Sequence, residues 1–192
     1  YMKDAPLDMR MDCDQTLTAY EVVNDFSEED LARILFDYGE EKLARVIARR
    51  IVNHRSQKPI ETTLELAKIV EDSYPAKTRW KFGHPAKRTF QAIRIEVNGE
   101  LSRLDEAITA MARRLKKGGR MAVITFHSLE DRIVKSAFKQ LSLACTCPPD
   151  FPVCVCGKVQ EVELVNKKPI VATEQELEIN PRSQSAKLRV VE

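Results

Sequence analysis

Apolar residues recur at helical spacing through residues 16–74, in segments that carry their own start and stop signals. The clearest segment begins after Ser27, an N-cap residue type, and stops at Gly39, and its apolar face is Leu31, Ile34 and Leu35. Similar patterns predict a helix capped by Thr18, one over residues 40–55, and one capped by Thr62 or Thr63. The pattern therefore predicts a compact all-helical unit.

The predicted helix over residues 40–55 separates two kinds of side chain. Its apolar positions point to one side and are Leu43, Val46, Ile47 and Ile51. Basic residues at spacings of three and four, among them Arg49, fall on the other side. One face therefore packs into the helical unit and the other is a basic surface.

A second helical pattern runs from about Thr89 to Leu115 and ends in a basic turn with two glycines. It predicts one long helix. The expected inward residues are Ile93, Val97, Leu101, Leu104, Ile108, Met111 and Leu115.

The stretch 120–126, RMAVITF, shows no polar alternation except at Thr125, which predicts a strand buried on both faces in a parallel sheet. A helix over residues 128–141 follows, with Ser128 as its expected cap and Asp131 three residues later. Residues 159–172 and 185–192 predict two more strands. This α/β half has too few strands for a parallel sheet, so we expect its earlier strands to lie outside this sequence.

Composition adds a core and a charge pattern to this picture. Of the 192 residues, 43% are hydrophobic and 31% are charged, which predicts a real core and a well-solvated surface. The net charge of +2 hides two basic stretches without any acid, residues 42–60 and 73–95. The second stretch also carries Trp80, Phe82 and Phe90. Together they favour a polyanion such as nucleic acid as partner, and a solvated helix face is the alternative.

His127 and Ser128 stand where the predicted strand 120–126 ends. In open α/β sheets, ligands bind beside the carboxyl ends of strands. An imidazole there can donate or accept a hydrogen bond, which makes His127 a candidate for function. Ser128 is either part of the same site or only the cap of the following helix.

Four of the five cysteines form a C-x-C, six-residue, C-x-C array. Four thiolates within such a short segment suit a tetrahedral zinc site, while free thiols or redox-active pairs are the alternatives. No apolar run is long enough for a membrane span and no signal peptide opens the sequence, so we expect a cytoplasmic protein with reduced thiols. The residues of the array are Cys145, Cys147, Cys154 and Cys156.

Four blocks of sequence resemble one protein family. They are PLDMRMD at 6–12, HPAKRTFQAIRIEVNGEL at 84–101, GGRMAVITFHSLEDRIVK at 118–135 and NPRSQSAKLRV at 180–190. In this order they are similar to the rear portion of the bacterial small-subunit ribosomal RNA cytosine-N4 methyltransferases, the MraW family. The resemblance extends over the whole chain.

The resemblance implies a class I methyltransferase with a Rossmann-like sheet, S-adenosylmethionine as methyl donor, and an inserted helical domain that recognises the substrate. Residues 1–15 would be a loop of the core, 16–86 the insert and 87–192 the C-terminal part of the core. The implied reaction is N4-methylation of a cytidine in the decoding region of small-subunit rRNA. The family's glycine-rich cofactor loop precedes PLDMRMD and is not found here. The N-terminal cofactor-binding strands are therefore absent, and no cofactor-binding residue is assigned.

The resemblance also suggests site residues. His127 and Ser128 would line the base pocket as catalytic candidates, and Arg10 is either structural or orders the loop beside the cofactor pocket. Alternatives to an enzyme are an RNA-binding module without catalysis and a zinc-stabilised interaction protein, and a homodimer is a further candidate assembly. The residues expected to contact the small ribosomal subunit are His84, Lys87, Arg88, Arg49 and Arg182.

Overall fold

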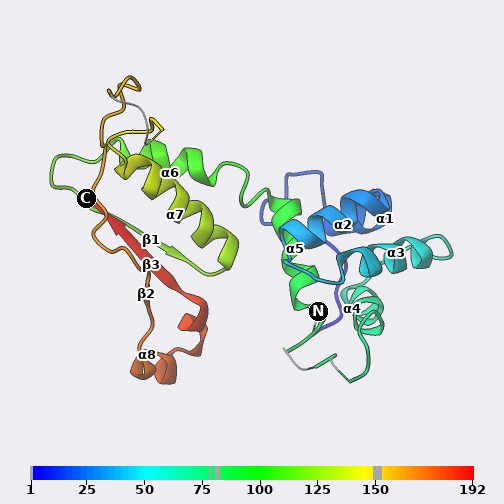
Figure 1. Ribbon diagram of the computed structural model, residues 1–192. Helices are drawn as coiled ribbons and strands as arrows, with labels where there is room; N and C mark the ends of the chain where they lie inside the picture. Colours follow the sequence, from blue (N-terminus) through cyan, green and yellow to red (C-terminus); the bar gives the residue numbers. More distant parts are fainter. Residues whose placement is uncertain (1, 78, 81–82, 149–152) are drawn as a thin grey trace. The chain divides into compact units, whose positions relative to one another are not determined.

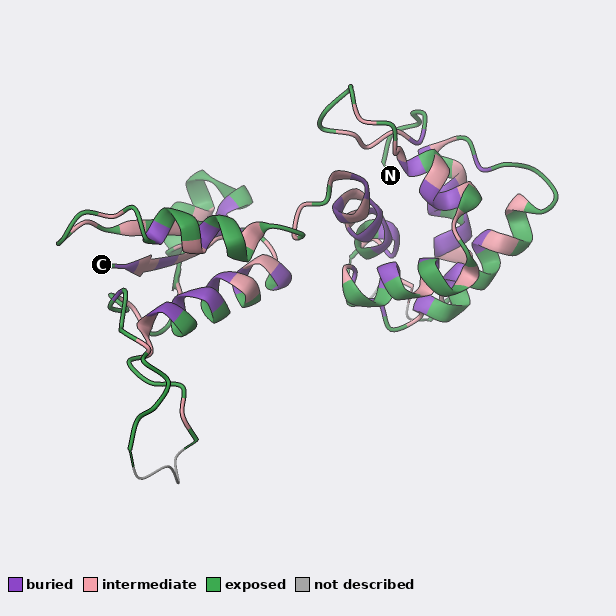
Figure 2. Ribbon diagram, turned by 90° about the horizontal axis from the view of Figure 1, so that it is seen from above, coloured by how far each residue is buried: buried purple, intermediate pink, exposed green. Residues whose placement is uncertain are grey.

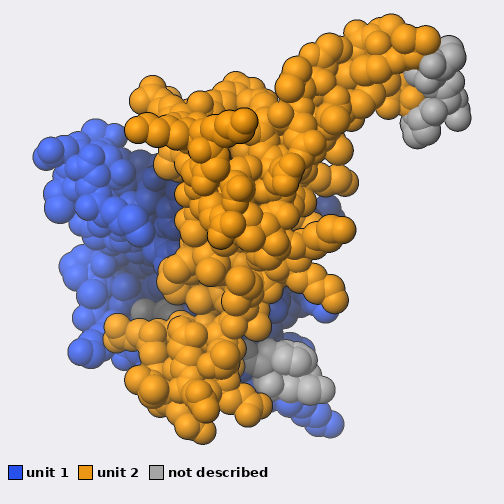
Figure 3. Space-filling model, turned by 90° about the vertical axis from the view of Figure 1, so that its left-hand side faces the viewer, with its two compact units in different colours: residues 1–100 blue, residues 101–192 orange. Residues whose placement is uncertain are grey.

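A computed structural model describes residues 2–77, 79–80, 83–148 and 153–192 (Figure 1). The chain divides into two compact units, residues 1–100 and 101–192, which Figure 3 shows in different colours. Lys81 and Phe82 of the second basic stretch lie outside the described residues. None of the helices in the described part has the length and apolar character that a membrane crossing needs.

Unit 1 contains the predicted helical region. Its helices are α1 (Ala19–Asp25), α2 (Glu28–Asp37), α3 (Ala44–Arg55), α4 (Thr63–Asp72) and α5 (Ala86–Asn98). The N-caps of α1 and α2 are Thr18 and Ser27 as predicted, and Thr62 is the cap of α4. Thr18 and Thr62 each complete a capping box with a glutamate three residues on, which satisfies two orphan N–H groups at each helix start.

The core of unit 1 is formed by the inward faces of all five helices. Leu31, Ile34 and Leu35 of α2 are fully buried, as the sequence predicts. Ile47 and Ile51 of α3 are fully buried as predicted, but the prediction is wrong for Val46, which is 44% exposed, whereas Ala44 is buried.

The predicted long helix over residues 89–115 is wrong, because the chain forms two helices there. α5 ends at Asn98, and Gly99 takes a left-handed conformation with φ 58° that stops the helix. α6 (Leu104–Ala112) follows in unit 2. Ile108 is buried as expected, while Met111 is 51% exposed.

α5 belongs to the compact helical unit by its packing. Phe90 and Ile93 are buried in the same core as α2. The compact unit therefore extends to Glu100, beyond residue 86 where the predicted insert ends. The assignment of residues 1–15 and 87–192 to a methyltransferase core stays a prediction.

Unit 2 holds a small sheet and the remaining helices. In chain order after α6 come β1 (Met121–Thr125), α7 (Ser128–Ser142), β2 (Ile170–Val171), α8 (Glu174–Ile179), the 3-10 helix η1 (Pro181–Ser185) and β3 (Lys187–Val191). The strand order is β1-β3-β2, and both pairings are antiparallel. Met121 pairs with Val191 at one end of the β1–β3 ladder, and Thr125 pairs with Lys187 at the other.

Two strand predictions need correction. The parallel sheet is wrong for the described residues, because β1 pairs with the C-terminal strand, which runs the opposite way. The strand predicted over 159–172 is reduced to β2 and an isolated bridge between Leu164 and Val191. Pro169 lies just before β2 and has no backbone N–H to donate, which favours a short strand there.

Helices α6 and α7 share a hydrophobic core with one face of the sheet in unit 2, and buried residues are coloured purple in Figure 2. Val134 and Phe138 of α7 are buried in this core together with Val191 of β3. The opposite face of β1 carries Ala122 and Ile124, and Ile124 is 58% exposed. The expectation of a strand buried on both faces is therefore wrong for this chain.

Candidate functional site

The corner after β1 is organised by the side chain of His127. His127 is the N-cap of α7, and its Nδ1 accepts a hydrogen bond from the backbone N–H of Glu130 at 3.4 Å. The Glu130 carboxylate in turn accepts from the N–H groups of Phe126 (2.9 Å) and His127 (3.3 Å). This is a capping box built on an imidazole in place of a hydroxyl.

The prediction that Ser128 caps α7 is therefore wrong. Ser128 is the first residue of α7 and is exposed. That His127 caps the helix in place of Ser128 has a chemical consequence for its imidazole. Because Nδ1 accepts a hydrogen bond, a neutral imidazole carries its proton on Nε2. Nε2 is buried and lies 3.2 Å from Glu130 Oε1 without hydrogen-bond geometry.

Below this corner lies a buried ion pair that the sequence did not single out. Arg189 of β3 donates two hydrogen bonds to the Asp131 carboxylate of α7, at 2.7 and 3.1 Å. The hydrogen bond from Arg189 lowers the pKa of Asp131, against the opposing effect of burial. Lys187 Nζ lies 3.6 Å from the same carboxylate. In the sequence, the pair could have been suspected from the two-residue spacing of Lys187 and Arg189, which puts both basic side chains on one face of a strand.

Arg182 lies on η1, which leads directly into β3. β3 begins at Lys187, opposite Thr125, so η1 reaches the sheet at the end where His127 and Ser128 follow β1. Arg182 is exposed. The structure thus brings three predicted site residues of unit 2 to one end of the sheet.

His84 stands just before α5 in unit 1. Its Nδ1 accepts a hydrogen bond from the Ala86 N–H at 3.2 Å, and its Nε2 lies 3.3 Å from Glu71 Oε1. Trp80 contacts its ring edge-on, with ring centroids 5.1 Å apart. These contacts join the start of α5 to α4, which gives His84 a structural role whatever else it binds.

Lys87 and Arg88 lie in the first turn of α5 and are both exposed. Arg88 donates to the backbone carbonyl of Glu40 at 3.1 Å. Lys87 borders a shallow pocket together with Thr63 and Phe90. Two cations at a helix N-terminus oppose the helix dipole, so this position favours a bound anion that offsets the charge.

The two basic stretches contain both solvated and structural cations. Arg49 is 71% exposed at the side chain and lies 3.4 Å from Glu28. Arg55 instead donates to two carbonyls at the end of α1, that of Val23 in its last turn and that of Phe26 at its C-cap. Arg94 forms a two-bond pair with Glu100 at 2.7 and 2.9 Å. The basic surface is therefore smaller than the sequence count suggests.

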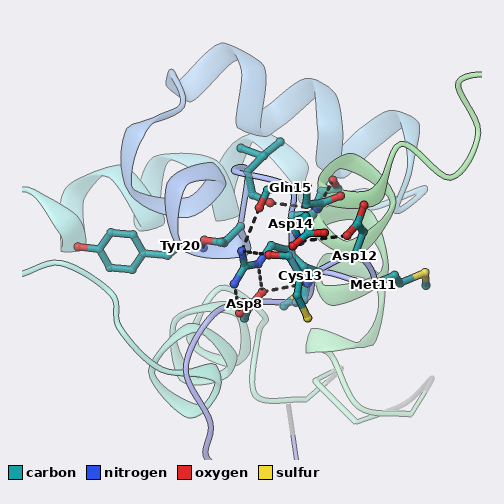
Figure 4. Close-up of polar contacts among 12 residues, drawn as sticks. Asp8, Met11, Asp12, Cys13, Asp14, Gln15 and Tyr20 are labelled. Carbon is teal, nitrogen blue, oxygen red and sulfur yellow. Dashed lines mark hydrogen bonds and ion pairs between the residues drawn. The ribbon is translucent and has the colours of Figure 1, made fainter.

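Arg10 organises the loop that contains PLDMRMD, and its partners Asp8, Cys13 and Gln15 are labelled in Figure 4. Its guanidinium donates to both carboxylate oxygens of Asp8 at 2.7 and 2.9 Å, and to the carbonyls of Cys13 and Gln15. The side-chain hydrogen bond from Arg10 lowers the pKa of Asp8 to about 2. Arg10 therefore has a structural role in ordering this loop, and its place beside a cofactor pocket stays a prediction.

The same loop contains an unusual backbone position. Met9 has φ 62°, a left-handed conformation that is costly for a side chain other than glycine. The Asn98 side chain holds it by donating to the Met9 carbonyl at 2.9 Å and accepting from the Met11 N–H at 2.7 Å. Such fixed strain is typical of functional loops, and the sequence pattern did not predict the left-handed conformation of Met9.

The four clustered cysteines lie in the segment between α7 and β2, apart from the corner residues in sequence. Their sulfur atoms all lie within 4.8 Å of one another. The predicted array is thus brought together in space.

The whole chain, residues 1–192, matches the model of the MraW methylase family. The chain belongs to the MraW methylase family. A protein of Clostridium botulinum (strain Kyoto / Type A2) named ribosomal RNA small subunit methyltransferase H is 60% identical over 190 residues, which are 99% of this chain. A protein of the same name from Paenibacillus sp. (strain JDR-2) is 59% identical over 192 residues. The chain spans 61% of the length of each of these two relatives.

S-adenosylmethionine is the methyl donor that the family suggests, and the described residues do not form a recognisable cradle for it. A class I site uses a glycine turn directly after a strand. β1 is followed by Phe126 and His127, and β2 by Ala172 and Thr173. Gly118 and Gly119 stand before β1. We therefore assign no donor-binding residue within this chain.

Proposed function

We propose that this chain is part of an S-adenosylmethionine-dependent enzyme that methylates N4 of a cytidine in the decoding region of small-subunit rRNA. The main support for this proposal is the family match over residues 1–192, together with 60% identity to a protein named ribosomal RNA small subunit methyltransferase H. The exposed cations of unit 1 and the corner of unit 2 fit an RNA substrate.

Methylation of this amine sets clear demands on the site. The lone pair of a cytosine exocyclic amine is delocalised into the ring, so the amine needs exact alignment and an acceptor for a proton. The His127 imidazole caps α7 through Nδ1, so in its neutral form it has no free lone pair to take that proton. We assign His127 a positioning role at the start of α7, and Ser128, which is exposed beside it, a place in the base pocket.

Lys87, Arg88, Arg49 and Arg182 supply positive charge for phosphate contacts in this proposal. Such contacts set the affinity and register of RNA rather than the choice of base. Arg88 is held by Glu40 through one nitrogen, which leaves its other N–H groups able to face a phosphate.

A reconstitution experiment tests the proposal. The chain is compared with a chimera that adds the part of the Clostridium botulinum relative that this chain does not cover. Each is incubated with labelled S-adenosylmethionine and small ribosomal subunits that lack the modification, and the modified nucleoside is identified by mass spectrometry. We expect N4-methylcytidine from the chimera only. Methylation at carbon 5, or none by a folded chimera, would contradict the proposal.

A second candidate is an RNA-binding module without catalysis. The observation that favours it is that no glycine turn follows a strand in the described residues. Calorimetric titration of S-adenosylmethionine into the 192-residue chain separates the two readings. We expect no heat of binding from the chain alone, whereas stoichiometric binding would place the donor site within it.

A further inference from the structure

Residues 143–148 and 153–160, which lie between α7 and β2, belong to a loop, and these described residues extend away from the helices and the sheet of unit 2 (Figures 1 and 2). Its base is closed where the Leu141 carbonyl accepts from Glu161 N–H at 2.9 Å. Further out, Val153 and Val155 are 69% and 71% exposed. The described part of the loop therefore has no hydrophobic core of its own to hold its conformation.

The sulfur atoms of this loop stand at the spacing of a tetrahedral metal site. Cys154 Sγ lies 3.4 Å from Cys145 Sγ, 3.5 Å from Cys156 Sγ and 4.0 Å from Cys147 Sγ. Cys145 and Cys156 are 3.7 Å apart. A zinc ion with zinc–sulfur bonds of about 2.3 Å needs sulfur atoms about 3.8 Å apart. A disulfide needs about 2.05 Å, so none of these pairs is bonded.

Backbone N–H groups point at three of the four sulfurs. Cys145 Sγ accepts from the N–H of Cys147 at 3.3 Å, Cys147 Sγ from Val155 at 3.4 Å, and Cys156 Sγ from Thr146 at 3.4 Å. Hydrogen bonds of this kind orient metal-binding sulfurs and stabilise their negative charge. Each C-x-C pair thus receives donors from its own turn or the facing one.

We propose that Cys145, Cys147, Cys154 and Cys156 bind one structural Zn²⁺ ion that fixes this loop. All four positions would be filled by protein sulfur, which leaves no open position for catalysis. Binding releases the thiol protons to solvent and involves no change of oxidation state. The site is independent of methyl transfer.

Metal content and thiol counting test the site on the full 192-residue chain. We expect one zinc per chain by elemental analysis, and a tetrahedral thiolate spectrum when Co²⁺ replaces it. Cys13 is exposed and lies outside the cluster, so it serves as an internal reference. With zinc bound, a thiol reagent should titrate one fast cysteine, and after chelation all five.

Variants complete the test. Cys154→Ser should lose the metal and the cobalt spectrum, while Cys13→Ser should keep both. Circular dichroism checks that the helices of Cys154→Ser are unchanged, because the loop lies outside both cores. The site would be overturned if the chain held no metal after purification in the presence of zinc. It would also be overturned if mass spectra of protein purified under reducing conditions showed disulfides among these cysteines, or if Cys154→Ser still bound one zinc per chain. Iron in place of zinc would overturn the choice of metal.

Discussion

His127 shows how one side chain sets the geometry of the corner after β1. Its imidazole binds the N–H of Glu130, and Glu130 returns two hydrogen bonds to the chain before the helix. This cap fixes Ser128 at the start of α7, beside which we propose the base pocket. A variant of His127 therefore changes both the stability of α7 and the position of the site.

Replacing His127 by alanine removes the acceptor for the Glu130 N–H. We expect His127→Ala to lower the free energy of unfolding by about 1 kcal/mol, and His127→Asn to keep most of it, because asparagine is a good N-cap. Urea denaturation of the two variants measures this. Equal losses would show that the imidazole contributes packing rather than a cap.

The Asp131–Arg189 pair predicts a stability that depends on pH. The folded pKa of Asp131 is lowered, so its contribution is complete above the unfolded value near 3.8 and is lost as pH falls through the folded pKa. We expect the unfolding free energy to fall below about pH 4. Denaturation between pH 3 and pH 7 should show a smaller slope for Asp131→Asn.

The same variant leaves Arg189 buried without its partner. Breaking a buried pair by removing one charge costs about 3–5 kcal/mol. Asp131→Asn should therefore be much less stable at pH 7, whereas Arg120→Ala, which breaks the exposed Arg120–Glu192 pair, should change little. Similar small losses in both would show that the Asp131 pair is well solvated.

At the scale of elements, Gly99 separates two helices that the sequence pattern joins. Its φ of 58° is unfavourable for most side chains. We expect Gly99→Ala to cost about 1 kcal/mol, and Gly99→Asn less, because asparagine tolerates this conformation. Thermal unfolding compares the pair, and a stabilised Gly99→Ala would mean that α5 extends into α6 without cost.

The elements that the sequence predicts well are those whose signals are local. Ser27, Thr18 and Thr62 are residue types that strongly favour the N-cap position, and each of them caps a helix in the structure. The capping role of His127 was not predicted, because imidazole caps are uncommon and Ser128, a common cap type, stands next to it. Gly99 was missed because isolated glycine occurs within helices and the apolar pattern continues beyond it.

Features that depend on contacts between distant parts of the sequence were predicted less well. The apolar run of β1 predicts burial on both faces, and within this chain only one face is covered. Basic residues could be counted from the sequence, but local partners decide which of them stay exposed for the RNA contacts that we propose. Arg55 and Arg94 are engaged within unit 1, and Asp131 found its partner far away in sequence at Arg189.

At the scale of the whole molecule, exposed cations should make RNA binding dependent on salt. Lys87→Ala should weaken binding to small-subunit rRNA and reduce the slope of log affinity against log salt by about 1. Arg120→Ala also removes one positive charge, but Arg120 forms an ion pair with Glu192, so this variant should change the slope less. Filter binding over a salt series measures both, and equal slopes would remove Lys87 from the interface.

The exposed face and edge of β1 also govern how copies of this chain behave in solution. Within the described residues β1 pairs on one side only, with β3, and Ile124 and Phe126 are each 58% exposed. An apolar strand edge is a template for pairing with another chain. Concentrated solutions should therefore form dimers and then β-rich aggregates, which sedimentation would detect. Ile124→Lys should keep the chain dispersed, because a charge at an edge strand opposes stacking of copies.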